Sequence, residues 1–299
     1  MKYFPKKLTM TWIRNSYKEG SLSPEELAGE IVRRAEKYRD YNIWIVAPDL
    51  KRMMDYIEKL PKDMESLPLW GIPFAVKDNI DVAGSPTTAA CPDYAYDPKE
   101  DAAVVKKLIK AGAFPVGKTN LDQFATGLVG TRSPYGEVKN ALDPELISGG
   151  SSSGSAVSVA LGMAAFSLGT DTAGSGRVPA ALNCLVGYKP SLGAWSTKGV
   201  VPACASLDCV TVFANSLEDA EEVNFAARGV DEECCWSREY EEPLQKLPQK
   251  ICLAKDGVTF YGPYADIYRA KWEQAKRRIE DMGITVEYID YTMFSKAAS

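Results

Sequence analysis

Short apolar runs alternate with amphipathic helical patterns along most of this 299-residue chain. An apolar run at 70–77, for example, is followed by a helical pattern at 101–112 and then by another apolar run at 113–118. Such alternation indicates an α/β protein, in which helices cover the faces of a central sheet. We predict strands at 42–48, 70–77, 113–118, 164–170, 208–215, 250–256 and 284–290, and helices at 23–40, 49–60, 101–112, 155–163, 216–228, 264–283 and from near Arg177.

The chain has one candidate domain boundary, the charged and proline-bearing stretch at 239–250. The length alone allows two domains, but single α/β domains of this size are common. We therefore interpret 239–250 as a connection within one domain that covers residues 1–299.

Composition argues against several classes of partner. Acidic residues outnumber Lys and Arg by 40 to 35, a net charge of −5, so we expect no nucleic-acid partner. No window holds the roughly 18 consecutive apolar residues of a transmembrane helix, so we expect no membrane partner. The seven cysteines follow no metal-site spacing and are interpreted as reduced thiols of a cytoplasmic protein.

The chain contains no histidine. A Ser-His-Asp triad and a zinc site built on histidine are therefore both excluded. A serine nucleophile would need another base, and lysine can serve when burial lowers its pKa. Lys77 ends the apolar run at 71–76 and is the candidate base, although most lysines at strand ends are solvated. Lowering a lysine pKa by about 3 units from its reference value near 10.4 costs about 4 kcal/mol, which burial can supply.

One segment fits the pattern of a phosphate-binding loop. Residues 112–119 read GAFPVGKT, which matches G-x-x-x-x-G-K-[ST]. A true phosphate-binding loop follows a strand and opens a helix, whereas here a predicted helix precedes Gly112 and a predicted strand follows it. We interpret Gly112 as the residue that ends the helix and keep nucleotide binding as an alternative.

Two glycine- and serine-rich segments, at 147–155 and 169–182, each lead into a predicted helix. Small residues let the backbone approach a ligand, and consecutive amides in a tight turn can converge on an oxyanion. In the second segment Ser175 would expose its hydroxyl beside such amides, so it is a candidate nucleophile. A surface loop and an ordinary structural turn are the alternative interpretations of these two segments.

Three motifs together resemble the amidase signature family, from about residue 10 to the end of the chain. They are GIPFAVKDNIDVAG at 71–84, GGSSSGSA at 149–156 and GTDTAGSGRVPA at 169–180. The resemblance implies an α/β fold with a central mixed β-sheet flanked by helices. It also implies a Ser–cis-Ser–Lys triad with Lys77 as base, Ser151 as relay and Ser175 as nucleophile. The cis peptide bond of the relay serine should follow Gly150.

The same resemblance implies further roles near the nucleophile. The backbone amides of Thr172, Ala173, Gly174 and Ser175 would form the oxyanion hole, and the backbone of Gly127 would touch substrate. No metal and no organic cofactor would be needed.

Two charged residues flank the nucleophile turn. Asp171 and Arg177 are interpreted as a pair that braces the turn, with direct substrate contact as the alternative.

Within the family, the chain is similar to the branch that hydrolyses allophanate, a small acid derived from urea. The segments that carry this likeness are 86–92, 121–136, 173–180 and 199–209. Resemblance to this branch implies a small-molecule substrate and a functional link to a urea carboxylase. It is also compatible with a homodimer. Members of the branch continue well past this length. We therefore expect the domain to be truncated at its C-terminus, with an arginine and a tyrosine that bind the substrate carboxylate lying beyond Ser299.

Two further interpretations remain open at this point. The chain could be another amidase, such as one that supplies ammonia to misacylated tRNA within a larger complex. It could also be an inactive fragment that keeps the motifs without turnover.

Overall fold

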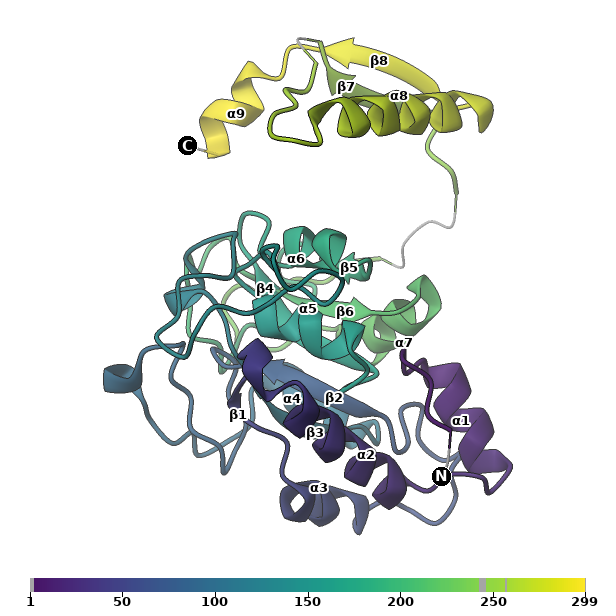
Figure 1. Ribbon diagram of the computed structural model, residues 1–299, viewed down its shortest axis with the longest axis vertical. Coiled ribbons are helices and arrows are strands. Elements are labelled where there is room, and N and C mark those ends of the chain that lie inside the picture. The colour runs from purple at the N-terminus through teal and green to yellow at the C-terminus, as the bar shows by residue number, and fades with distance from the viewer. Residues whose placement is uncertain (1–2, 242–245, 256, 299) are drawn as a thin grey trace. The chain divides into compact units, whose positions relative to one another are not determined.

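The computed structural model describes residues 3–241, 246–255 and 257–298. By their contacts the residues divide into two compact units, Met1–Tyr240 and Glu241–Ser299 (Figure 1). The division falls inside the stretch 239–250 that we interpreted as a connection. That residues 1–299 form one domain stays a prediction, because a grouping of contacts does not test whether the two units fold together.

A six-stranded mixed sheet forms the centre of the first unit (Figure 1). Its order is β1 (Trp44–Val46), β3 (Phe114–Thr119), β2 (Pro73–Lys77), β4 (Phe166–Asp171), β6 (Cys209–Ala214) and β5 (Val186–Tyr188). Strand β2 runs parallel to β3 and to β4, whereas the other neighbours are antiparallel. Because parallel strands end at the same edge of a sheet, the residues after β2 and after β4 meet there.

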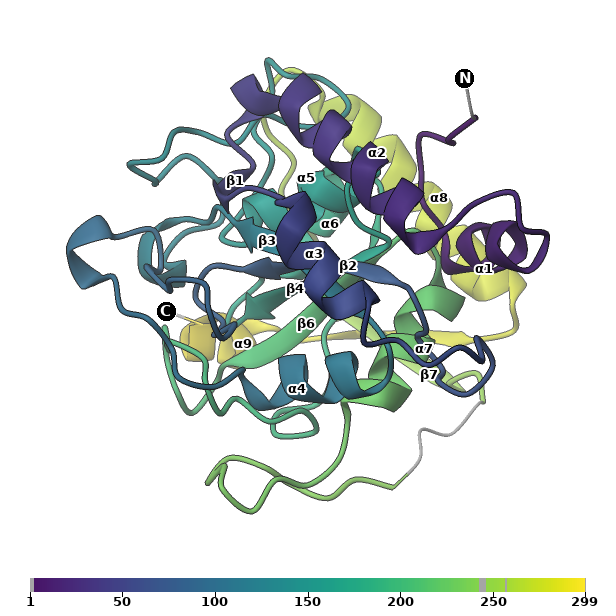
Figure 2. The same ribbon diagram turned by 90° about the horizontal axis from the view of Figure 1, so that it is seen from below.

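Helices pack around this sheet (Figure 2). They are α1 (Met10–Lys18), α2 (Pro24–Lys37), α3 (Leu50–Ile57), α4 (Ala103–Lys110), α5 (Ser153–Ala160), α6 (Arg177–Leu182) and α7 (Leu217–Ala227). Helix α3 packs on β3, α4 packs on β3 and α7, and α7 packs on β5 and β6. Elements α1 and β5 lie outside the predicted set, whereas the predicted helices and strands of this unit are present.

Helix α5 is buried along its whole length and contacts β2, β3, β4 and β6. It contains only Ser, Gly, Ala and Val, so its backbone can lie close to the sheet. The Thr119 hydroxyl of β3 lies 2.8 Å from the Ser155 hydroxyl of α5, which identifies the face of the sheet that α5 covers. The N-terminus of α5 therefore lies over the strand ends of β2 and β4.

The second unit consists of β7 (Lys250–Ala254), α8 (Ala265–Asp281), β8 (Thr285–Ile289) and α9 (Thr292–Ala298). Strands β7 and β8 pair in parallel, and α8 connects them in a β-α-β order. The predicted strand at 250–256 and the predicted helix and strand at 264–290 correspond to these elements, with Asp256 outside the described residues. Helix α9 was not predicted.

The pattern that resembles a phosphate-binding loop has a structural role. Helix α4 ends at Lys110, Gly112 adopts a φ of +98°, and β3 begins at Phe114. The order is helix, glycine, strand, as the sequence indicated, and not the strand, loop, helix order that cradles phosphate. The glycine is needed because its left-handed φ is strained for other residues.

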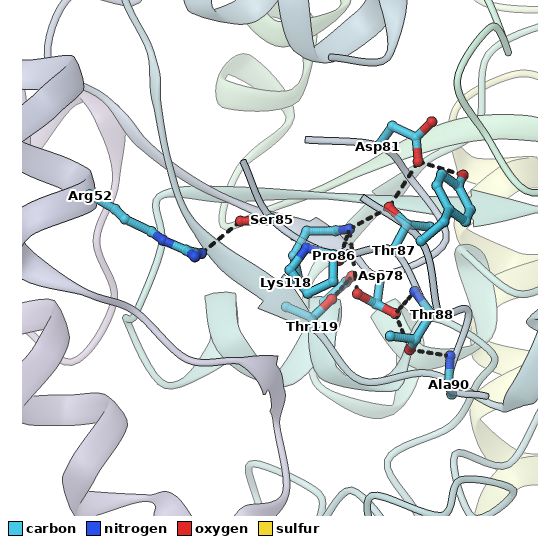
Figure 3. Close-up of polar contacts among 12 residues, drawn as sticks. Arg52, Asp78, Asp81, Ser85, Pro86, Thr87, Thr88, Ala90, Lys118 and Thr119 are labelled. Atoms are coloured by element: carbon cyan, nitrogen blue, oxygen red, sulfur yellow. Dashed lines mark hydrogen bonds and ion pairs between the residues drawn. The ribbon is translucent and has the colours of Figure 1, made fainter. Parts of the chain in front are cut away.

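Lys118, the lysine of that pattern, is buried. Its amine makes polar contacts with Asp78 and Thr87 (Figure 3). Its Nζ lies 3.4 Å from Asp78 Oδ1 and donates a hydrogen bond to Thr87 Oγ1 at 3.1 Å. Asp78 Oδ2 accepts hydrogen bonds from the amide and the hydroxyl of Thr88, at 2.9 and 2.6 Å. Because Asp78 directly follows Lys77, this buried ion pair holds the end of β2 in place.

Replacing Lys118 by methionine is expected to lower the free energy of unfolding by about 3–5 kcal/mol, because it leaves the buried carboxylate of Asp78 without a counter-charge. Chemical denaturation measures the loss. The double variant Lys118→Met, Asp78→Asn should regain part of it, since no uncompensated charge remains. Equal stability of the wild type and the Lys118→Met variant would contradict this role of the ion pair.

Candidate active site

Lys77 is the last residue of β2 and is fully buried. Its Nζ lies 2.8 Å from Ser151 Oγ and 2.7 Å from Thr170 Oγ1. As an ammonium group Lys77 donates to both hydroxyls, and as a neutral amine it has a lone pair that can accept the Ser151 proton. The structure therefore brings together the predicted base and the predicted relay serine, which are 74 residues apart in the chain.

Burial lowers the pKa of Lys77 from 10.5 to about 7, while the carboxylates of Asp122, Asp208 and Asp171 oppose this shift. Desolvation disfavours the charged form of a buried amine, and negative charges nearby favour it. The balance leaves a substantial fraction of the amine neutral at neutral pH. A lysine in this state can act as a general base.

Ser151 lies just before α5, and the peptide bond between Gly150 and Ser151 is cis, as the resemblance implied. Its side chain faces Lys77, and its carbonyl oxygen accepts a hydrogen bond from the Asp122 amide at 3.0 Å. The serine is completely buried.

Ser175 lies in the turn between β4 and α6 and is almost fully buried. Its Oγ donates a long hydrogen bond of 3.4 Å to the carbonyl oxygen of Gly127. Its own carbonyl oxygen accepts a hydrogen bond from the Ser152 amide at 3.3 Å, which ties the nucleophile turn to the relay loop. The candidate nucleophile thus lies between the loop of Gly127 and the loop of Ser151.

Asp171 organises the nucleophile turn. Its carboxylate accepts hydrogen bonds from the Gly174 and Gly176 amides, at 2.7 and 3.1 Å. It also accepts the Nε and Nη2 groups of Arg177, at 2.9 and 3.0 Å. Burial raises the pKa of Asp171, but these donors outweigh it and the pKa lies below its ordinary value. The predicted bracing pair is therefore present.

This arrangement changes one expectation for the oxyanion hole. The Gly174 amide was expected to face the oxyanion, but in the structure it donates to Asp171. The amides of Thr172, Ala173 and Ser175 are the remaining candidates.

The other serines of the glycine-rich segment have structural roles. The hydroxyl of Ser152 donates to Thr170 O at 3.1 Å and accepts from the Thr170 amide at 3.2 Å. The Ser155 hydroxyl donates to Leu168 O at 2.9 Å. Buried backbone groups need such partners, and small hydroxyl side chains supply them without added bulk.

Sequence reasoning missed several residues that contact this site, among them Thr170 and Asp208, as well as Asp122, whose amide binds Ser151. Thr170, whose hydroxyl forms a hydrogen bond with the Lys77 amine, lies inside the motif at 169–180, one residue before the end of β4. The Asp208 carboxylate accepts the hydroxyl of Thr172 and the amides of Ala203 and Cys204. The position of Thr170 at a strand end was a usable signal, whereas no local pattern pointed from Asp208 to the nucleophile turn.

In the part of the chain that the structure describes, no group of three or more His, Cys, Asp or Glu side chains is arranged to hold a metal ion. Within that same part, every helix is too short or too polar to cross a bilayer.

Comparison with known proteins identifies the family. Residues 26–299 match the protein family described as Amidase, so the chain belongs to the amidase family. Among its relatives is urea amidolyase of Saccharomyces cerevisiae, which is 52% identical over 226 residues. That match covers 74% of this chain and 12% of the yeast protein.

Comparison with solved structures agrees with this family assignment. The allophanate hydrolase of Kluyveromyces lactis superposes with a TM-score of 0.84 at 42% identity, covering 95% of this chain and 47% of that one. A more distant relative is a glutamyl-tRNA(Gln) amidotransferase component of Methanosarcina mazei, 35% identical over 94% of this chain and 59% of its own length. These likenesses confirm the predicted α/β fold with a mixed sheet. The chain spans less than two thirds of each of these three relatives.

Proposed function

We propose that the chain is an amide hydrolase that uses Lys77, Ser151 and Ser175 as a Ser–cis-Ser–Lys triad. The observation that carries the proposal is the fully buried Lys77 amine, 2.8 Å from the Ser151 hydroxyl, with a pKa near 7. In a chain without histidine, this amine is a base that can work at neutral pH.

The proton moves in two linked steps. Lys77 takes the proton of Ser151, Ser151 takes the proton of Ser175, and Ser175 Oγ forms a bond to the amide carbon of the substrate. When the tetrahedral intermediate collapses, the C–N bond breaks and the relay returns the proton to the departing ammonia. Water then attacks the acyl-enzyme by the same route and restores the Ser175 hydroxyl.

Backbone amides would stabilise the negative oxygen of the intermediate. We assign this role to Thr172, Ala173 and Ser175, because the Gly174 amide is bound to Asp171. Each such donor contributes about 3 kcal/mol where it has been measured. We propose that the carbonyl of Gly127, which lies 3.4 Å from Ser175 Oγ, accepts a hydrogen bond from the substrate amide.

We propose allophanate as the substrate, with ammonia and carbon dioxide as the final products. The likeness to the yeast urea amidolyase and to the Kluyveromyces lactis allophanate hydrolase supports this choice over glutamine, since the amidotransferase relative is less similar. Hydrolysis of the terminal amide releases one ammonia and leaves N-carboxycarbamate, which takes up protons, loses both carboxyl groups as carbon dioxide and releases the second nitrogen as ammonia.

The substrate also implies a partner reaction. Allophanate is carboxylated urea, so a urea carboxylase would supply it, and the name of the yeast relative, urea amidolyase, also refers to urea. We further propose a cytoplasmic location, which the seven free cysteines support because reduced thiols are typical of that compartment. A homodimer is proposed as well, and analytical ultracentrifugation tests it.

Steady-state ammonia release tests the proposed substrate. The wild-type chain is expected to release ammonia from allophanate with a higher kcat/KM than from glutamine, because it is more similar to the urea amidolyase and allophanate hydrolase relatives than to the amidotransferase relative. The Ser175→Ala variant serves as the control for uncatalysed decay. Preference for glutamine would instead identify an ammonia-supplying amidase, and release from neither substrate would contradict the proposed hydrolase.

A further inference from the structure

We infer that Asp122 is a positioning residue that holds the Gly127–Arg132 loop against the relay serine, an inference that rests on the proposed triad. Asp122 is completely buried and follows β3 by three residues. It touches neither Lys77 nor Ser175 through a hydrogen bond. Its role is therefore to set the geometry of residues that act on the substrate.

The Asp122 carboxylate binds the loop at two points. Oδ2 accepts the Gly130 amide at 3.0 Å, and Oδ1 accepts the Arg132 amide at 2.9 Å. The loop also passes close to the carboxylate at Gly127, where an added Cβ would lie 2.7 Å from Oδ2. Gly127 has a φ of +151°, so both its conformation and this close approach require glycine.

The same residue also reaches the relay serine. The Asp122 amide donates to the Ser151 carbonyl oxygen at 3.0 Å. A Cβ on Gly150 would overlap Asp122 Oδ2, so the carboxylate fills the space beside the Gly150–Ser151 bond. One side chain and its own amide thus join the loop whose Gly127 carbonyl faces Ser175 to the loop that carries Ser151.

The charge of Asp122 adds a second effect. Three carboxylates act on Lys77 from different elements: Asp122 after β3, Asp171 at the end of β4 and Asp208 before β6. Each is held by backbone amides, so none can turn away when Lys77 changes its charge. Removing the charge of Asp122 should therefore lower the pKa of Lys77 further, because a negative neighbour favours the ammonium form.

The rate at which a fluorophosphonate labels Ser175, measured against pH, tests the inference on the 299-residue chain without a choice of substrate. In the wild type we expect the rate to rise with pH to a plateau. The Asp122→Asn variant should shift the midpoint down by about one pH unit. It should also lower the plateau by about 10²-fold, since loops displaced by about 1 Å cost that much.

Two further variants separate charge from position. Asp122→Glu keeps the charge but does not fit beside Gly127 and Gly150, so we expect the wild-type midpoint with a lowered plateau. Asp219→Asn is the matched control, because Asp219 is a buried aspartate that accepts the Met10 amide at 3.3 Å and lies on α7. It should change neither the midpoint nor the plateau.

Two outcomes would overturn the inference about Asp122, and a third would contradict the proposed triad. A folded Asp122→Asn variant with wild-type midpoint and plateau would overturn the inference. Failure of both Asp122 variants to fold, judged by circular dichroism, would also overturn it, because Asp122 would then support the fold as a whole. Absence of Ser175 labelling in the wild type would instead contradict the proposed triad, on which the inference depends.

Discussion

Replacing Lys77 by arginine or methionine is expected to reduce amide hydrolysis by about 10³-fold or more, because the proton of Ser151 then loses its basic acceptor. Arginine keeps a positive charge but does not deprotonate in proteins. Methionine keeps the approximate length and removes the amine. The measurement is kcat/KM for ammonia release, with intact folding verified by circular dichroism.

The methionine variant is the more informative of the two. A buried amine is costly to desolvate, so an apolar side chain of similar size should keep the fold stable while it removes the base. Lys106→Arg on the exposed side of α4 is a suitable control and should keep wild-type rates. Near-normal turnover in either Lys77 variant would mean that the lysine is structural and that the proton takes another path.

The same lysine determines how activity depends on pH. Its pKa of about 7 means that the neutral form, which accepts the proton, increases as pH rises through that value. Below the pKa, each unit of pH should lower kcat/KM about tenfold, and above it the rate should level off. A rate that falls with rising pH over this range would show that the ammonium form is the active one.

Local patterns were sufficient to predict most of the secondary structure. The apolar run before Lys77 and the one at 164–170 form β2 and β4, whose parallel pairing places Lys77 and the nucleophile turn at one edge of the sheet. Strand β5 was missed, and in the structure it is held by pairing with β6 along three residues. Helix α1 was also missed, although Thr9 as N-cap before a periodic apolar face is a local signal for a helix.

The candidate site could be predicted only in part. Lys77, Ser151 and Ser175 lie in motifs, and the absence of histidine narrowed the choice of base. The carboxylates of Asp122 and Asp208 are held by backbone amides that lie 4–10 residues away in the sequence. Asp208 also accepts a hydrogen bond from the hydroxyl of Thr172. Sequence alone shows neither which carboxylates are buried nor which amides they bind.

The oxyanion hole illustrates the same limit. The sequence does not distinguish the four backbone amides of residues 172–175 from one another. Only the structure reveals that the Gly174 amide donates a hydrogen bond to the Asp171 carboxylate. A short acidic side chain at the end of a strand can turn back on the next residues, and the strand-to-helix geometry decides which amides it meets.

Replacing Ser175 by alanine is expected to have the largest effect of any single change, a loss of hydrolysis on the order of 10⁵-fold. The variant removes the only atom that is proposed to bond to the substrate carbon, while the turn keeps its shape through Asp171. Mass spectrometry after treatment with a serine-directed fluorophosphonate should find one adduct, on the peptide that contains Ser175, and none in the alanine variant.

Ser152→Ala is the matched control, because Ser152 is equally buried but binds only the Thr170 backbone through its hydroxyl. That variant should still form the adduct on Ser175. Ser151→Ala should slow labelling strongly without removing its target, because the relay is broken while the nucleophile remains. An adduct that persists in the Ser175→Ala variant would place the nucleophile elsewhere, and equal labelling of the Ser151→Ala variant would show that Lys77 reaches Ser175 without a relay.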